Sequence, residues 1–330
     1  MNKIICIGSS GKDIFFPTAE GVILDTPEDL KSQKKIAFEM GAKYHIEDRF
    51  ETLGGCAVNQ SVGLLRLGVP AACYTVLGSD MVGEWIEKEI KKEGVNMDLL
   101  IKEDCPSGLS AIIVDQKSGE RIIFSNQEAN ERMKVVAEKM EGAEWISVSD
   151  LSGDWQNILD EIMKVAHGSG AKVVFNPRGK NIQDDAGKVF EISRQCDVFF
   201  INKDEAIEIL AAGKSQLDNQ DEKYLIREIK NGGAKIVVMT DGTNGAWATD
   251  GQKIIFAEAQ VKKAVDTTGG GDAFSSGFLA AYVKGKSLEE CLQWGTANGG
   301  NSVKFYGGVE GLLRENEIED KIKDIEVKNL

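Results

Sequence analysis

The sequence predicts an α/β protein built on a doubly wound, mostly parallel central sheet with helices on both faces, plus a small β-sheet lid. Short, nearly continuous apolar runs recur along the chain, as expected of strands buried on both faces of a parallel sheet. Helix-length segments such as 154–167 and 220–231 lie between these runs, an alternation typical of doubly wound folds. Two stretches that break the alternation predict the lid.

The predicted strands are short. In chain order they are 3–8 (KIICIG), 144–149 (EWISVS), 172–176 (KVVFN), 197–202 (DVFFIN) and 235–240 (KIVVMT). The first apolar run ends at Gly8, so we interpret it as a buried strand rather than a signal peptide. No segment approaches the ~20 apolar residues of a membrane span. We therefore expect a cytoplasmic protein without a membrane segment.

The lid is predicted from residues 15–51, a long charged stretch, and residues 105–125, which contain the hairpin SAIIVD–QKSG–ERIIFS. The core then comprises residues 1–14, 52–104 and 126–330. A flap made of two separate insertions is a candidate cover for a site. The charged tail, 314–330, is expected to form a solvated terminal helix or a frayed end.

Composition limits the function. The net charge is −14 and the basic residues are scattered, so a nucleic-acid partner is not expected. Backbone amides and one or two cations can still hold a small anion. The six cysteines lie far apart and form no CxxC pair, which favours buried free thiols over disulfides or zinc.

The most informative segment is VDTTGGGDAFSSGFLAAY, residues 265–282. Phe274, Phe278 and Tyr282 recur every four residues, the spacing of one helix face. Gly269, Gly270 and Gly271 therefore lead into a helix N-terminus, where free amides and the absence of Cβ atoms favour an anion. Asp272 would stand beside this anion hole. Together they suit phosphoryl transfer to an alcohol.

The glycine-containing segments of the chain have other possible interpretations. The loop could be a tight turn with Asp272 as a helix cap. A dinucleotide fingerprint fits poorly, because its third glycine would fall on Phe274. The segment AAGKS at 211–215 is not a P-loop, because its first glycine would fall on Glu208.

The stretch VDTTGGGDAFSSGF resembles the C-terminal signature of the ribokinase-like (PfkB) carbohydrate kinase family, D-T-x-G-A-G-D, with Gly270 in place of the alanine. Four further motifs in the family's order extend the resemblance over nearly the whole chain. GSSGKD places Asp13 where the family binds sugar hydroxyls, although aspartate is also a common turn former. In LGGCAVNQ, Gly54, Gly55 and Asn59 match the family's acceptor-binding element.

The other two motifs concern the nucleotide. In FINKDEA, Asn202 and Glu205 match the family's N-x-x-E motif, which acts on magnesium and phosphates through water. A plain helix cap with glutamate at the third position is the alternative. In TDGTNGA, the residues that match the family's nucleotide loop are Thr240, Gly242 and Gly245.

Four further residues are assigned, three of them from the resemblance and Arg178 from the chemistry of its side chain. Asn298 in WGTANGG matches a position that borders the adenine. Asp266 and Thr268 match residues that help bind a monovalent cation such as K⁺, but the later loop NSVKFYGGVEG departs from the family pattern and leaves potassium activation open. Arg178 in FNPRGK suits phosphate geometry and would lie on the acceptor side, with a surface position as the alternative.

The resemblance therefore implies a kinase that uses ATP and Mg²⁺ to phosphorylate a hydroxymethyl group of a sugar or sugar-like acceptor. Asp272 would be the base, and lid closure would exclude water. Relatives often pair through their lids, so a homodimer is expected. A nucleoside kinase with the same apparatus is the first alternative. A non-catalytic sugar or nucleotide sensor and a dinucleotide oxidoreductase are the others.

Overall fold

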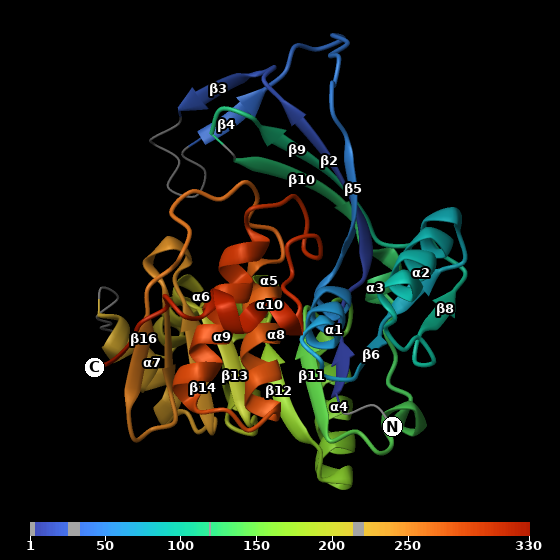
Figure 1. The fold of residues 1–330 in the computed structure, drawn as a ribbon. Helices are drawn as coiled ribbons and strands as arrows, with labels where there is room; N and C mark the ends of the chain where they lie inside the picture. The colour runs from blue at the N-terminus through green and yellow to red at the C-terminus, as the bar shows by residue number, and fades with distance from the viewer. Residues whose placement is uncertain (1–3, 26–33, 119, 214–220) are drawn as a thin grey trace.

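The computed structural model describes residues 4–25, 34–118, 120–213 and 221–330. Its centre is a nine-stranded sheet of order β17-β16-β15-β14-β13-β12-β11-β1-β6 (Figure 1). The parallel strands are β1 (Ile4–Ile7), β6 (Ala71–Tyr74), β11 (Trp145–Ser149), β12 (Lys172–Asn176), β13 (Val198–Asn202) and β14 (Ile236–Thr240). The strands that continue the sheet antiparallel are β15 (Ala246–Thr249), β16 (Ile254–Ala257) and β17 (Val327–Asn329).

The predicted strands correspond to β1, β11, β12, β13 and β14, which confirms the parallel sheet. The predicted helix over 154–167 is α4 (Trp155–Ser169), and that over 220–231 is α7 (Glu222–Asn231), Gln220 lying outside the described residues. The tail prediction was half wrong. Residues Glu315–Lys321 do form helix α10, but β17 then pairs with β16, because the edge of the main sheet offers unpaired backbone groups.

Helices cover both faces of the main sheet, each over its own buried apolar cluster (Figure 1). One face carries α1 (Cys56–Arg66), α2 (Met81–Glu93), α8 (Gly270–Val283), α9 (Leu288–Ser302) and α10. The other carries α3 (Glu128–Glu131), the 3₁₀ turn Ala137–Met140, α4, α5 (Gly179–Ser193), α6 (Lys203–Ala211) and α7. Successive residues of β13 alternate between the clusters: Phe200 packs on the α8 side and Phe199 on the α4 side.

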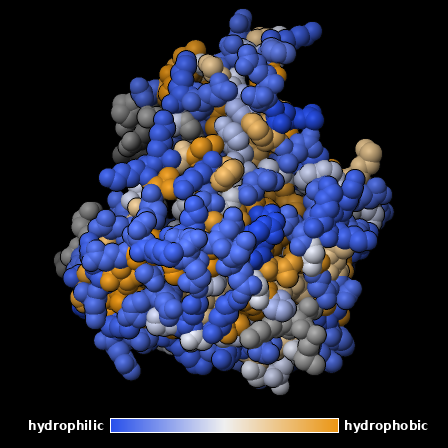
Figure 2. Space-filling view, viewed as in Figure 1, coloured by the Kyte–Doolittle hydropathy of each residue, from blue (hydrophilic) through white to orange (hydrophobic). Residues whose placement is uncertain are grey.

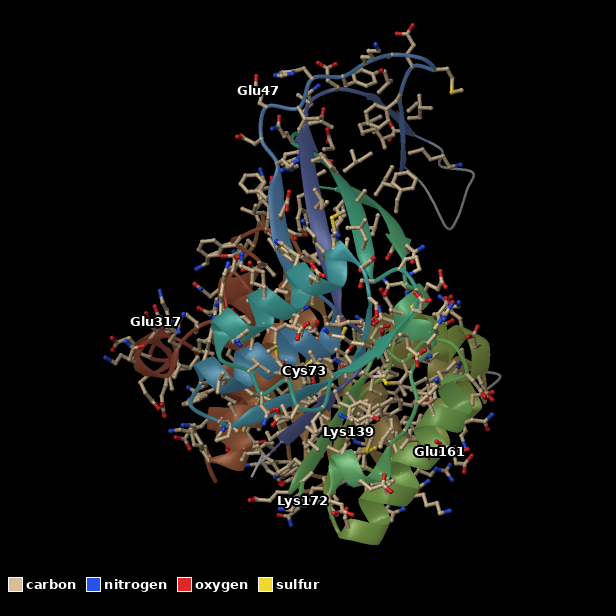
Figure 3. All side chains as sticks on the ribbon, turned by 90° about the vertical axis from the view of Figure 1, so that its right-hand side faces the viewer. Glu47, Cys73, Lys139, Glu161, Lys172 and Glu317 are labelled. Atoms are coloured by element: carbon tan, nitrogen blue, oxygen red, sulfur yellow. The ribbon has the colours of Figure 1, made fainter. Side chains whose placement is uncertain are left out.

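A four-stranded sheet of order β10-β9-β2-β5 stands over one end of the core, and Glu47 lies near its far tip (Figures 1 and 3). Its strands are β2 (Gly11–Thr18), β5 (Phe50–Gly54), β9 (Leu109–Asp115) and β10 (Arg121–Asn126). The β9–β10 pairing confirms the predicted hairpin. A hairpin of β3 (Val22–Asp25) and β4 (Lys34–Ala37) extends it, while residues 26–33 of the predicted lid lie outside the described residues.

The boundary between core and lid differs by a few residues from the prediction. The small sheet already begins at Gly11, where the prediction kept residues up to 14 in the core, and it ends at Asn126. The last two-stranded sheet pairs β7 (Val76–Gly78) with β8 (Ile101–Glu103). Among the described residues, no helix combines the length and apolar character that crossing a membrane requires. All six cysteines are free thiols, and Cys6, Cys73, Cys196 and Cys291 are buried as predicted.

Candidate active site

The glycine loop ends in an open helix start. Gly269 is the N-cap of α8 with a left-handed backbone, φ 72°, and a Cβ there would lie 2.4 Å from the Cα of Gly308. The amide of Gly270 donates to the carbonyl of Thr267 at 3.2 Å. Within the described part of the chain, the amides of Gly269, Gly271 and Asp272 find no acceptor. Three free donors on a helix dipole form a site for an anion.

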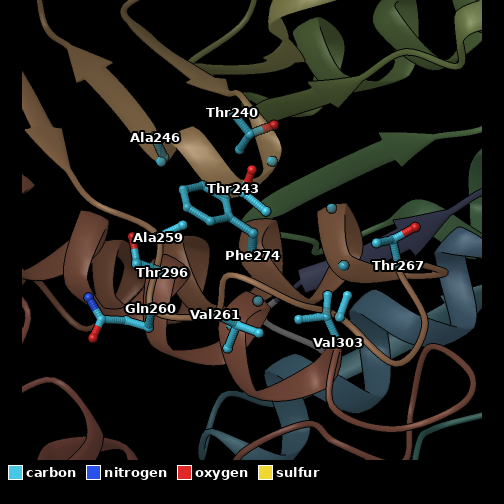
Figure 4. Close-up of a pocket in the computed structure, with 17 residues that line it drawn as sticks. Thr240, Thr243, Ala246, Ala259, Gln260, Val261, Thr267, Phe274, Thr296 and Val303 are labelled. Carbon is cyan, nitrogen blue, oxygen red and sulfur yellow. The ribbon is translucent and has the colours of Figure 1, made fainter. Parts of the chain in front are cut away.

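A cavity of about 220 Å³ lies beside this helix start (Figure 4). Its walls come from the end of β14, the 3₁₀ turn Gly242–Asn244, the loop before α8, and the C-terminal half of α9. Thr240, Gly242 and Gly245 line it, together with Gly270 and Gly271. The predicted nucleotide loop and the predicted anion hole therefore open into one space, and none of the described residues that line it is charged.

Asp272 is a buried carboxylate, 6% exposed, in the first turn of α8. Its Oδ2 accepts a hydrogen bond of 2.9 Å from Nδ2 of Asn59 in α1. The pKa of Asp272 is raised to about 6, chiefly by burial and in smaller part by the charge of Asp150, while hydrogen bonds from Asn59 and Cys56 partly offset this rise. A carboxylate poised near neutrality suits a general base.

Asp13 lies on β2, also buried, and the pKa of its carboxyl is raised by burial to about 6. A Cβ at Gly54 would lie 2.2 Å from Oδ2 of Asp13, so glycine is needed for this approach. Gly55 follows with φ 92° and starts the helix that carries Asn59. The predicted acceptor residues therefore form a continuous row from Asp13 to Asp272. The Oδ1 of Asn59 is buried and unpartnered among the described residues.

Arg178 reaches toward the same end of the sheet. Its Nε lies 3.2 Å from Oδ1 of Asp150, and its Nη1 donates to Oγ of Ser152 at 3.1 Å. Asp150 also accepts a hydrogen bond from Ser9. With φ 48°, Asp150 is the one non-glycine residue of the described chain in the left-handed region. Because Asp150 acts on the pKa of Asp272, Arg178 lies on the site side of the molecule.

Asn202 and Glu205 form a reciprocal capping box at the start of α6. Oδ1 of Asn202 accepts from the amide of Glu205, and Oε2 of Glu205 accepts from the amide of Asn202, both at 2.9 Å. Asn202 pairs in register with Thr240, so the box lies beside the nucleotide loop. Oε1 of Glu205 is not used by the box. No group of three or more metal-binding side chains occurs in the described ranges, so any Mg²⁺ here would rely on phosphate and water oxygens.

The role predicted for Asn298 beside the adenine stays a prediction. Its side chain is fully buried, donating to the carbonyl of Ala273 at 2.7 Å and accepting from the amide of Leu313 at 2.8 Å. It does not reach the cavity, because this side of α9 packs against α8. The neighbouring Thr296 does line the cavity, and its hydroxyl is buried without a partner in the described chain.

Asp266 and Thr268 do lie together ahead of the anion hole. Oδ1 of Asp266 accepts from both the amide and the hydroxyl of Thr268, at 3.0 and 2.8 Å, and Oδ2 accepts from the amide of Gly307 at 3.0 Å. Sequence reasoning missed Cys56, Asp150 and Arg121, which contact these groups. The φ of Asp150 and the reach of Arg121 from the lid depend on tertiary structure, so no local pattern marks them.

Comparisons with known proteins agree with this geometry. The family model for pfkB family carbohydrate kinases matches residues 33–313. An uncharacterized sugar kinase of Archaeoglobus fulgidus is 30% identical over 256 residues, covering 77% of this chain and 99% of that protein. A nucleoside kinase of Methanocaldococcus jannaschii is 26% identical over 324 residues, covering 98% of this chain and 97% of that protein.

Solved structures share the fold. The crystal structure of a Methanocaldococcus jannaschii nucleoside kinase superposes with a TM-score of 0.75 at 22% identity, covering 98% of each chain. A putative ribokinase II from E. coli gives 0.79 at 18% identity, covering 98% of this chain and 99% of that one. The fold is therefore ribokinase-like, as predicted. With its signature motif, its fold and the family match in agreement, the chain belongs to the pfkB family of carbohydrate kinases.

Proposed function

We propose that this protein transfers the γ-phosphoryl group of ATP to a hydroxymethyl group of a sugar or sugar-like acceptor. One observation carries the proposal: a buried carboxylate, Asp272, adjoins three amides that have no acceptor in the described chain, and Gly271 among them lines the cavity. The amides can hold the moving phosphoryl group, while the carboxylate can take a proton from an alcohol. Both groups sit on one rigid helix start, so their relative position is fixed before any ligand arrives.

The nucleotide would occupy the cavity. Thr240, Gly242 and Gly245 would border it on one side, and Thr296 offers an unpartnered hydroxyl on the other. Gly270 and Gly271 would adjoin its terminal phosphates. Magnesium would arrive with the nucleotide and supply charge neutralisation to the phosphates. The free oxygen of Glu205 is placed to accept a hydrogen bond from magnesium-bound water.

The acceptor would lie along the row from Asp13 to Asn59, beneath the small sheet. Asp13 can accept hydrogen bonds from sugar hydroxyls, and Gly54 and Gly55 let a ligand approach the backbone. In the chemical step the acceptor oxygen bonds to the γ-phosphorus while its proton passes to Asp272. The bond from that phosphorus to the β–γ bridging oxygen breaks, and ADP leaves with the electron pair. The guanidinium of Arg178 could bind the phosphoryl oxygens if its ion pair with Asp150 breaks.

A nucleoside acceptor is the second candidate, because aromatic surface borders the proposed acceptor row. Phe15 follows Asp13 by two residues on β2 and therefore faces the same way. Tyr306 lies 5.5 Å from Phe15 and stacks on Phe50 at 4.8 Å, measured between ring centroids. Phe15 is buried beneath the other two rings, so a base could stack on Phe50 or Tyr306, whereas a free sugar uses mainly polar partners.

We also propose that a second copy of the chain covers the lid. Apolar side chains lie exposed on β3 and β10, among them Val22 and Phe124, both 61% exposed. Figure 2 shows hydrophobic side chains among polar ones at this end of the molecule. Such patches mark interaction sites. Light scattering should give a dimer mass for the wild type and a monomer mass for Phe124→Glu. A monomeric wild type would exclude this assembly.

The function is tested by coupled detection of ADP over a panel of pentoses, hexoses, ketoses and nucleosides with MgATP. We expect acceptor-dependent ADP release, which Asp272→Ala should slow by about two orders of magnitude or more. Turnover confined to nucleosides would favour the second candidate. Saturable acceptor binding by calorimetry without any turnover would instead indicate a sensor and contradict the kinase proposal.

A further inference from the structure

An arginine of the lid touches the loop that precedes the anion hole. Arg121 is the first residue of β10, opposite Val114 of β9. Its Nη1 donates to the hydroxyl of Thr267 at 2.6 Å and lies 3.9 Å from Oδ1 of Asp266. Thr267 itself lines the cavity, and its carbonyl holds the amide of Gly270. One side chain thus joins the small sheet to the loop that shapes the anion hole.

The Asp266 carboxylate needs a positive partner. The residue is 3% exposed, and its other partners, Thr268 and Gly307, are neutral donors. Neutral hydrogen bonds reduce the cost of a buried charge but leave its net charge uncompensated. Across the described ranges, Arg121 is the one cationic side chain within 4 Å of Asp266. The side chain of Arg121 is itself about three-quarters buried, so solvent screens the pair only partly.

With Arg121 in place, these residues fit a monovalent cation poorly. Thr268 donates its hydroxyl proton to Asp266, and both oxygens of Asp266 already accept hydrogen bonds. A guanidinium at 3.9 Å would also repel a second cation at the same carboxylate. The Nε of Arg121 is buried and has no acceptor in the described chain. Burying this donor without an acceptor costs free energy. We attribute the position of the arginine to its attraction to Asp266, which offsets that cost.

We propose that the guanidinium of Arg121 takes the place of a monovalent cation as the counter-charge of Asp266, so that the protein's activity is independent of K⁺. The proposal rests on the proposed kinase function only for its activity measurements. Because the counter-charge comes from the lid, the shape of the anion hole depends on the lid's position. A lid displaced from the core would leave Asp266 uncompensated and loosen the loop that carries Thr267.

The test compares wild type, Arg121→Gln and Arg121→Lys in KCl and in tetramethylammonium chloride at equal ionic strength. Arg49→Gln is the matched control, because Arg49 is a lid arginine whose side chain is 63% exposed and whose partner Glu51 also pairs with Lys12. Two quantities are measured: kcat with MgATP and the best acceptor, and Tm of the protein without nucleotide. The Tm needs no turnover, so it tests Arg121 even if the kinase proposal fails.

For wild type, Arg49→Gln and Arg121→Lys, we expect the same kcat and Tm in both salts. Arg121→Gln should lose about tenfold in kcat in tetramethylammonium, recover most of it in KCl, and show a Tm that rises with KCl concentration, since binding to the folded state stabilises it. Stimulation of the wild type several-fold by K⁺ would overturn the proposal. The proposal would also be overturned if Arg121→Gln folds but its kcat and Tm do not depend on the K⁺ concentration. If that variant does not fold, the wild-type comparison decides alone.

Discussion

Two helices begin at the same end of the main sheet, and their first turns are used in opposite ways. At α6, Asn202 is the N-cap and Glu205 the third helical residue, and their side chains satisfy the first amides reciprocally. At α8, Gly269 is the N-cap and Asp272 the third helical residue, yet no side chain among the described residues caps the helix. The carboxylate of Asp272 turns instead to Asn59 of α1. The same position thus serves the helix in α6 and is free for a ligand in α8.

The contrast has a physical basis. A side-chain cap contributes about 1 kcal/mol by satisfying donors that the helix cannot. The three amides at α8 that have no capping acceptor do not contribute that stabilisation. Such uncapped amides are expected where a ligand will accept their hydrogen bonds. The alternative that Asp272 is merely a helix cap is therefore wrong, whereas the capping alternative for Asn202 and Glu205 describes their side chains correctly.

The largest effect should come from removing the carboxylate of α8. Asp272→Ala should lower kcat by about two orders of magnitude or more, because the acceptor hydroxyl loses its base. The affinity for the acceptor, measured by calorimetry, should change little. Glu205→Ala is the matched change in α6, and this variant should keep most of its kcat. An Asp272→Ala enzyme that keeps wild-type kcat would show that the base lies elsewhere.

The pH profile should come next in size. The pKa of Asp272 is raised to about 6, so kcat should be flat above pH 7 and fall about tenfold per pH unit well below 6, where the base is protonated. The pKa of Asp13 is also raised to about 6, so kcat/KM should fall more steeply than kcat if ionised Asp13 binds the acceptor. A kcat that holds level down to pH 5 would contradict this assignment.

Asp13→Asn separates the two groups. In this variant the fall of kcat/KM at acid pH should follow the titration of one group, Asp272, instead of two. The variant also has a stability signature, because a carboxyl with a raised folded pKa stabilises the protein fully below its unfolded pKa and loses that contribution as pH rises through about 6. The Tm of Asp13→Asn relative to wild type should therefore be higher at pH 7.5 than at pH 4. An equal difference at both pH values would exclude a buried, protonating Asp13.

The glycines of α8 sharpen the comparison further. Gly269→Ala places a side chain at φ 72°, with its Cβ 2.4 Å from the backbone of Gly308, so both Tm and kcat should fall. A Cβ at Gly271 would meet no protein atom within 4 Å, although this residue lines the cavity. Gly271→Ala should therefore keep its Tm and raise the KM for ATP about tenfold, by displacing the phosphates slightly. A Gly271→Ala variant with unchanged KM would place the phosphates elsewhere.

The sequence predicts those features that depend on residues close together in the chain, and it misses those that depend on contacts between distant segments. The apolar runs of β11, β12, β13 and β14 reflect burial on both faces, which is a local property that the sequence displays directly. The helix start at Gly269 is likewise marked by local composition. By contrast, β17 forms because its partner β16 offers an edge some seventy residues earlier, and its own sequence, VKN, carries no strand pattern.

The same division applies within the site. Thr240, Gly242 and Gly245 were predicted from their resemblance to the family's nucleotide loop, which is a compact motif, and they do line the cavity. For Asn298, the motif position gives the residue but not the face of α9 on which its side chain lies, and that side chain bonds to Ala273 and Leu313. Arg121 and Asp150 were missed because their contacts, with Thr267 and with Arg178, join segments far apart in the chain.

The smallest effect should come from the capped helix. Asn202→Ala removes the acceptor for the amide of Glu205 and should cost about 1 kcal/mol of unfolding free energy, measured by urea titration. Its effect on kcat at saturating Mg²⁺ should be only a few-fold, because the side chain of Asn202 serves its own helix. Glu205→Gln keeps a carbonyl oxygen for the cap, so it should preserve stability, yet it lowers the charge available to magnesium-bound water. It should therefore raise the Mg²⁺ concentration needed for half-maximal activity. If Asn202→Ala instead abolished activity without loss of stability, the first turn of α6 would be a ligand site like that of α8, and the contrast between the two helix starts would fail.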